Sequence, residues 1–236
     1  MSRKVIIGLA ISILVIIGGV VLWNMTEESP RARANDFDYT AIITEGDDAE
    51  KNQAPANFAD RVFGNAESPI VVVEYGDFAC SACAMLSPII DEIRSEFGEQ
   101  VAFVFRHMPL STMQGHENSR AAALAAEVAG KQGKFWDYKA MLFRNQASWT
   151  FVPASERLSV FREFAESLGL DAEQFEEDFR HYSRPINQRL DFHVALARRQ
   201  DVAGTPTVFL NGEEIDNAAL FDRARFRSVL ERALEQ

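Results

Sequence analysis

The sequence predicts an α/β fold, built from a parallel strand–helix–strand unit and completed by an antiparallel hairpin and a last helix. A β-branched run at residues 70–75, IVVVEY, is followed by a helical pattern and then by the apolar run QVAFVFRHM at 100–108. Further along, TPTVFLNGEEI at 205–215 contains Asn-Gly, the strongest short signal for a hairpin. Two strands joined through a helix pair in parallel with a right-handed crossover, so both patterns can belong to one sheet.

The remaining elements follow from apolar spacing. After the first strand, apolar residues recur at helical intervals over 84–97 and Gly98 ends the run. A final helix is predicted at 217–235. Between the two halves the sequence predicts helices throughout, interrupted by Gly, Pro or polar residues. These segments are 117–130, 133–146, 153–169, 171–181 and 183–200.

The N-terminus predicts a membrane anchor at residues 1–24. Residues 5–23 carry no charge, and at about 1.5 Å per residue they can cross a hydrocarbon core of about 30 Å. Arg3 and Lys4 precede this run, so the N-terminus should stay in the cytoplasm and the rest of the chain should lie outside. The alternative is a cleaved signal peptide, whose apolar part would be shorter. Residues 25–62 are polar with little periodicity, and we expect a linker there.

Composition limits the function classes. A hydrophobic content of 47% with 25% charged residues is that of a globular protein with a substantial core. The net charge of −11 disfavours nucleic acid, whose phosphates require a basic surface. We therefore expect no nucleic-acid partner.

The two cysteines of the chain, Cys80 and Cys83, form a CxxC pair at the start of the predicted helix. A disulfide between them closes a tiny loop and stabilises little, so redox chemistry or metal binding is the better explanation. Zinc would need two further ligands, and no other cysteine exists, so we expect no metal. The helix N-terminus favours a thiolate at Cys80, the attacking species. Cys83, one turn later, is expected to be the buried resolving sulfur.

With these features the chain resembles the DsbA-like thiol–disulfide oxidoreductases of the thioredoxin superfamily. The resemblance is carried by the CxxC, by Glu74 six residues before it, and by Thr205-Pro206 before the hairpin. It implies a thioredoxin fold with an inserted helical domain, here preceded by the N-terminal transmembrane helix. The DsbA-like domain would occupy residues 63–236, with the insertion at about 112–190.

The resemblance implies a role for Glu74 as proton acceptor for Cys83 during exchange. Glu74 lies in a strand that should be buried, and a buried carboxylate is costly unless it is paired or protonated. The alternative is an acid at the end of the strand that reaches water. Asp77 should lie nearer the surface and is expected to be mostly solvated.

The resemblance also implies a substrate-binding loop at Thr205-Pro206, whereas the two residues between the cysteines differ from those of many relatives. Relatives hold the bond equivalent to Thr205-Pro206 cis beside the CxxC, where the Thr205 backbone can pair with a substrate strand. Many DsbA proteins carry a histidine between the cysteines, and Ser81 and Ala82 stand there instead. We therefore expect a thiol pKa at Cys80 below that of a free cysteine, but less depressed than in those relatives.

These observations together predict a monomeric, membrane-tethered, extracytoplasmic oxidoreductase that donates disulfides to unfolded exported proteins containing cysteines. No cofactor is expected beyond the Cys80–Cys83 disulfide itself. Reoxidation would need a membrane partner of the DsbB or vitamin K epoxide reductase type. The alternatives are a reductase or isomerase on the same fold, or a tethered module that binds copper or peptide.

Overall fold

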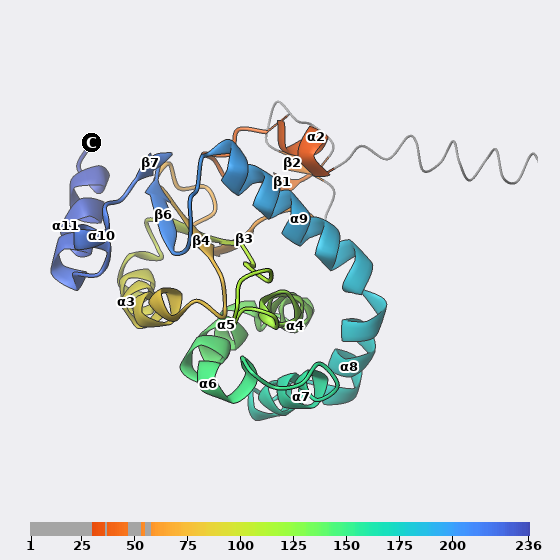
Figure 1. Cartoon of the computed structure of the whole chain (residues 1–236). Coiled ribbons are helices and arrows are strands. Elements are labelled where there is room, and N and C mark those ends of the chain that lie inside the picture. Colours follow the sequence, from red (N-terminus) through yellow and green to blue (C-terminus); the bar gives the residue numbers. More distant parts are fainter. Residues whose placement is uncertain (1–29, 36, 47–52, 55–57) are drawn as a thin grey trace, which may run out of the picture.

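The computed structural model describes residues 30–35, 37–46, 53–54 and 58–236. A five-stranded sheet has the order β3-β5-β4-β6-β7 (Figure 1), in which β4 and β5 are parallel and the other pairs antiparallel. Its strands are β3 (Arg61–Gly64), β4 (Val71–Gly76), β5 (Ala102–His107), β6 (Thr207–Leu210) and β7 (Glu213–Glu214). The predicted parallel unit and hairpin are confirmed. Both turn residues have positive φ, 48° at Asn211 and 85° at Gly212, the conformation that Asn-Gly tolerates best.

Helices cover both faces of this sheet and form a separate group beside it (Figure 1). Two short strands, β1 (Thr44–Glu45) and β2 (Gln53–Ala54), pair with each other. The helices are α2 (Pro30–Asn35), α3 (Ser81–Phe97), α4 (Ser119–Lys131), α5 (Phe135–Arg144), α6 (Gln146–Trp149), α7 (Arg157–Ser167), α8 (Ala172–His181), α9 (Ser183–Arg199), α10 (Asn217–Leu220) and α11 (Arg223–Leu234). The predicted C-terminal helix is thus divided into α10 and α11.

Alternation along β4 explains why its sequence is apolar on both faces, with Glu74 as the exception. Val72 points to the face covered by α3, α10 and α11, where it packs with Ile90 and Leu230. Val73 points to the opposite face, covered by α9 with Leu196. Because successive side chains alternate, a strand covered on both faces has no polar side.

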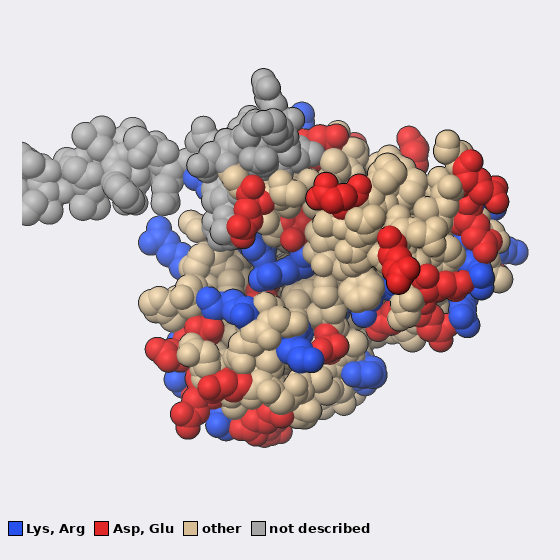
Figure 2. Space-filling view, turned by 180° about the vertical axis from the view of Figure 1, so that it is seen from behind, with Lys and Arg blue, Asp and Glu red and all other residues tan. Residues whose placement is uncertain are grey.

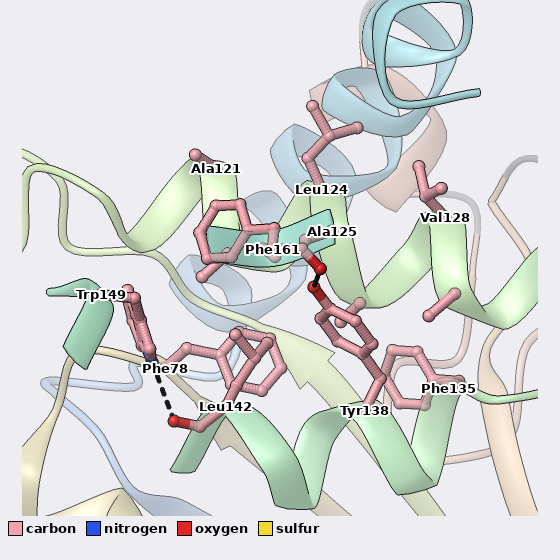
Figure 3. Packing of buried hydrophobic residues seen from close by; sticks show 14 of the residues in the cluster. Phe78, Ala121, Leu124, Ala125, Val128, Phe135, Tyr138, Leu142, Trp149 and Phe161 are labelled. Atoms are coloured by element: carbon pink, nitrogen blue, oxygen red, sulfur yellow. Dashed lines mark hydrogen bonds between the residues drawn. The ribbon is translucent and has the colours of Figure 1, made fainter. Parts of the chain in front are cut away.

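The helical insertion packs around a hydrophobic core that also includes Phe78, two residues before Cys80. Figure 3 shows Tyr138 donating to the carbonyl of Phe161 at 2.7 Å, with Phe78 in the same cluster. The insertion and the CxxC turn therefore share one apolar core. Helix α9 runs unbroken to Arg199, with Ile186 packed in the insertion core, so the predicted boundary near residue 190 falls inside a helix.

The prediction of a polar linker at 25–62 is wrong for the described residues. Phe37, Ile43 and Phe58 are buried against the sheet, and α2 packs along α9. Residues 61–64 add an edge strand, so the domain begins before residue 63. Sequence periodicity missed this segment because its buried apolar residues are few and irregularly spaced among polar ones.

A buried guanidinium fastens this segment to the sheet. Arg106, on β5, is 0% exposed and contacts both carboxylate oxygens of Asp60, at 3.0 and 2.8 Å. It also donates to the carbonyls of Tyr39 and Ala41 and to the hydroxyl of Tyr75. A buried charge needs such complete pairing, so Arg106 and the N-terminal segment depend on each other.

Among the described residues no helix is long and apolar enough to cross a membrane, and the predicted anchor at 1–24 lies outside them.

Candidate active site

The two cysteines lie at the start of α3, where the predicted geometry placed them. Cys80 is the N-cap residue and Cys83 lies in the first turn, and both are free thiols. Cys83 is 0% exposed and Cys80 is 9% exposed. Cys80 is thus the more exposed of the two cysteines. Its exposure is small because the 205–206 loop packs against it. Its sulfur lies 3.2 Å from the carbonyl oxygen of Thr205.

Local hydrogen bonds and burial give the two thiols different pKa values, lowered at Cys80 and raised at Cys83. The thiol of Cys83 donates to the Cys80 sulfur, and this is the largest influence on the pKa of Cys80, which falls to about 5. Thr205 and the backbone N–H groups of Cys83 and Ala82 act in the same direction, while burial acts against them. Burial raises the pKa of Cys83, and the Cys80 thiolate raises it further. These contacts favour a thiolate at Cys80 and a thiol at Cys83, in the direction expected for a sulfur at a helix N-terminus.

The dipeptide between the cysteines acts through its backbone. Ala82 contributes an N–H group to the sulfur of Cys80, whereas Ser81 is exposed on the outside of the helix. A thiolate at a helix N-cap is stabilised by unpaired N–H groups whatever side chains follow it. The chain therefore reaches a depressed thiol pKa without a histidine between the cysteines.

The loop before β6 offers Cys80 different partners in its two protonation states. The Thr205-Pro206 bond is cis, as the resemblance implied. As a thiol, Cys80 donates to the Thr205 carbonyl, and the buried Thr205 hydroxyl has no hydrogen-bond partner. A thiolate cannot donate a hydrogen bond. The Thr205 hydroxyl can then donate its proton to the Cys80 sulfur, and this lowers the pKa of Cys80.

Thr205→Val is therefore expected to raise the pKa of Cys80 by on the order of one unit, the worth of one hydrogen bond to a charged group. Thiolate ultraviolet absorbance, titrated against pH, measures this shift. Thr207→Val is the matched control, because the Thr207 hydroxyl donates to the Gly204 carbonyl at 2.9 Å in the same loop. Equal shifts in both variants would contradict a direct role for the Thr205 hydroxyl.

Glu74 is buried and paired with a lysine from the insertion. It is 3% exposed, and its carboxylate oxygen Oε2 lies 3.3 Å from Nζ of Lys139 on α5, which is 0% exposed. Burial raises the pKa of Glu74, with Lys139 opposing that effect. Glu74 in turn raises the pKa of Cys83. The alternative that Glu74 reaches water is wrong.

Sequence reasoning missed Lys139, although the pattern contained a signal for it. Phe135, Tyr138 and Leu142 are buried at helical spacing, and Lys139 falls on that same face of α5. Its ammonium group lies 5.0 and 5.1 Å from the ring centres of Phe105 and Phe143. A lysine inside an apolar helical stripe indicates a buried partner of opposite charge.

Lys139→Met is expected to raise the pKa of Glu74 further, because the buried carboxylate then loses its cation. A neutral Glu74 cannot accept a proton, so attack by Cys83 on a mixed disulfide at Cys80 should slow at least about tenfold. The release rate of glutathione from a preformed mixed disulfide measures this step. Lys134→Met, which removes an exposed ammonium group paired with Asp137, is the control. Equal rates in the two variants would rule out this role of Lys139.

Asp77 shapes the turn before Cys80, and the expectation that it is mostly solvated is wrong. It is 1% exposed and accepts the backbone N–H groups of Ala79 and Leu110, each at 2.9 Å. Its second oxygen also lies 2.7 Å from Nδ1 of His116. The carboxylate therefore fixes the backbone that leads into the CxxC.

Gln146 is a further residue that no sequence pattern indicated. Its side-chain amide, at the start of α6, donates to the carbonyls of Phe78 and Cys80 at 2.8 and 3.0 Å. Isolated glutamines carry no spacing signal, so only the folded arrangement brings it to the site.

Comparison with known proteins places this geometry in a family. The family model described as Thioredoxin matches residues 56–231. The structure is similar to oxidised BdbD from Bacillus subtilis, with a TM-score of 0.60 and 22% identity over 83% of this chain and 100% of that one. It is also similar to the thiol-disulfide exchange protein α-DsbA2 from Wolbachia pipientis, with a TM-score of 0.60 and 20% identity, covering 75% of this chain and 86% of that one.

Sequence relatives include much longer proteins. An Na(+)/H(+) antiporter, NhaA 1 of Mycolicibacterium vanbaalenii, is 37% identical over 155 residues, which is 65% of this chain and 23% of the antiporter. The antiporter NhaA of Herminiimonas arsenicoxydans is 31% identical over 172 residues, 73% of this chain and 25% of that protein. The chain thus spans about a quarter of the length of these relatives.

Proposed function

Because this chain belongs to the thioredoxin family, as a DsbA-like thiol–disulfide oxidoreductase, we propose that it donates disulfides to exported proteins. The observation that carries the proposal is the position of Cys80 at the N-cap of α3, with the buried thiol of Cys83 in the first turn. The hydrogen bonds at this position lower the pKa of Cys80 to about 5, below the value of about 8.5 for a free cysteine. A stabilised thiolate favours the reduced enzyme, and so makes its disulfide easier to give away.

The exchange runs in two displacements. A substrate thiolate attacks the Cys80 sulfur of the Cys80–Cys83 disulfide, and Cys83 leaves and takes up a proton. The second thiolate of the substrate attacks the substrate sulfur of the mixed disulfide, and Cys80 leaves as the stable thiolate. The substrate gains a disulfide and gives two electrons to the enzyme. Glu74 supplies the proton to Cys83 here, and accepts it when the pair is reoxidised.

The substrate-binding surface that we propose is the 205–206 loop beside Cys80. The Thr205 carbonyl already lies against the sulfur, so a bound extended segment could pair with this backbone while its cysteine reaches Cys80. The substrates would be unfolded exported proteins with cysteines, bound by a monomeric enzyme. On the face shown in Figure 2, acidic and basic side chains are interspersed among neutral ones. The net charge of −11 gives no support to a nucleic-acid partner.

The proposal also covers how the Cys80–Cys83 pair is reoxidised and where the protein is located. Two electrons must leave Cys80 and Cys83 after each turnover, which calls for a membrane partner of the DsbB or vitamin K epoxide reductase type. The apolar run at 5–23, with basic residues before it, supports a single-pass anchor with the domain outside the cytoplasm.

Equilibration of the protein with glutathione tests the direction of exchange. We expect a reduction potential above the value of about −270 mV for thioredoxin, together with oxidation of reduced ribonuclease. A potential at or below that of thioredoxin, with insulin reduction instead, would favour a reductase. Stoichiometric Cu(I) binding without any exchange activity would favour a copper-binding module.

A further inference from the structure

The corner between α5 and α6 reaches from the helical insertion to the CxxC turn. Nε2 of Gln146 donates to the carbonyl oxygens of Phe78 and Cys80, which lie 68 and 66 positions away in the chain. Neither bond involves a sulfur atom. Gln146 contacts the backbone on both sides of Ala79, immediately where the turn leads into the helix N-terminus.

The insertion holds this corner firmly. Trp149, at the end of α6, is 0% exposed and donates to the carbonyl of Leu142 at 2.9 Å, as Figure 3 shows. The side-chain amide of Asn118 donates to the carbonyls of Trp149 and Thr150, each at 3.1 Å. The hydroxyl of Thr150 donates back to the carbonyl of Gln146. Because the backbone around Gln146 is fixed at several points, its amide has a defined position.

The position of the Gln146 amide affects how well the turn stabilises a negative charge on the Cys80 sulfur. Carbonyl oxygens carry negative partial charge, and two of them lie in the turn that holds the Cys80 thiolate. The side-chain amide of Gln146 donates to both carbonyl oxygens and offsets their negative partial charge, at a site where little water screens it. The same bonds hold the turn so that the N–H groups of Ala82 and Cys83 face the sulfur.

We propose that Gln146 is a positioning residue for thiol–disulfide exchange, through which the helical insertion sets the stability of the Cys80 thiolate. The inference rests on the proposed function only in requiring exchange through Cys80. It holds equally for a disulfide donor and for a reductant, since both directions pass through the same thiolate.

Gln146→Leu tests the proposal, because leucine has a similar volume and no donor. We expect the thiolate fraction measured below the wild-type pKa to fall about threefold to tenfold, because the two hydrogen bonds from Gln146 to the turn are lost. The equilibrium with glutathione should shift by the same factor toward the disulfide. Gln146→Glu should shift both quantities at least as far, since an ionised carboxylate would face two carbonyl oxygens and a thiolate.

Gln132→Leu is the matched control. Gln132 also joins two segments through its side-chain amide, donating to the Asp171 carbonyl at 3.1 Å and accepting the Asp171 N–H at 2.9 Å. It should leave the thiolate titration and the glutathione equilibrium unchanged. Unchanged values in Gln146→Leu, or equal shifts in Gln132→Leu, would overturn the proposal, as would a loss of folding stability without either shift. If the wild-type reduction potential proves to be that of a reductase, the proposed direction of exchange is wrong. The comparison of Gln146→Leu with Gln132→Leu still tests the role of Gln146, because it depends only on the Cys80 thiolate.

Discussion

Cys83→Ser is expected to accumulate as mixed disulfides with substrates, whereas Cys80→Ser should trap few. In the first variant Cys80 remains at the helix N-terminus and can still form a bond to substrate, but no second thiol resolves it. In the second variant the remaining sulfur is 0% exposed and its pKa is raised by burial, so it rarely attacks or is attacked. Non-reducing gel electrophoresis of both variants after reaction with a protein substrate that contains disulfides gives the measurement, because the free thiolate then attacks a substrate disulfide and releases a substrate thiolate.

The same variants test how Cys80 is stabilised. The Cys83 thiol donates to the Cys80 thiolate, so Cys83→Ser, whose hydroxyl can still donate, should keep the pKa of Cys80 well below that of a free thiol. Cys83→Ala removes the donor and should raise it. Comparable trapping by Cys80→Ser and Cys83→Ser would refute the assignment of attacking and resolving sulfurs.

Arg106→Leu is expected to lower the free energy of unfolding by about 3–5 kcal/mol, because it leaves the buried carboxylate of Asp60 without its cation. The substitution also removes the donors to the carbonyls of Tyr39 and Ala41. Denaturant unfolding of the two proteins measures the difference. The change should be large because both side chains of the ion pair are 0% exposed.

Arg223→Leu is the control for this measurement. Arg223 pairs with Glu92 at 2.9 Å, but both side chains are more than half exposed, so its loss should cost less than about 1 kcal/mol. A chain that starts at residue 63, the boundary predicted from sequence, should be destabilised like Arg106→Leu, because it lacks Asp60. Full stability of that shortened chain would show that residues 30–62 contribute nothing to the fold.

The sequence by itself determined the cysteine pair at the start of a helix, the strands around it and the hairpin. These features are local: a β-branched run, a helical repeat after Cys80, and an Asn-Gly turn each carry their information within a few residues. The likeness to a known family added the cis bond at Thr205-Pro206, which the structure contains.

Only the tertiary structure decided which distant groups surround the thiols and where the domain begins. Lys139 meets Glu74, Gln146 meets the CxxC turn, and Asp60 meets Arg106, across separations of more than 40 residues. No local period encodes such pairs, because each partner is a single polar residue in its own segment. What selects them is the low polarity of the interior, where a charge or carbonyl without a partner is costly, and that cost arises only once the elements have packed.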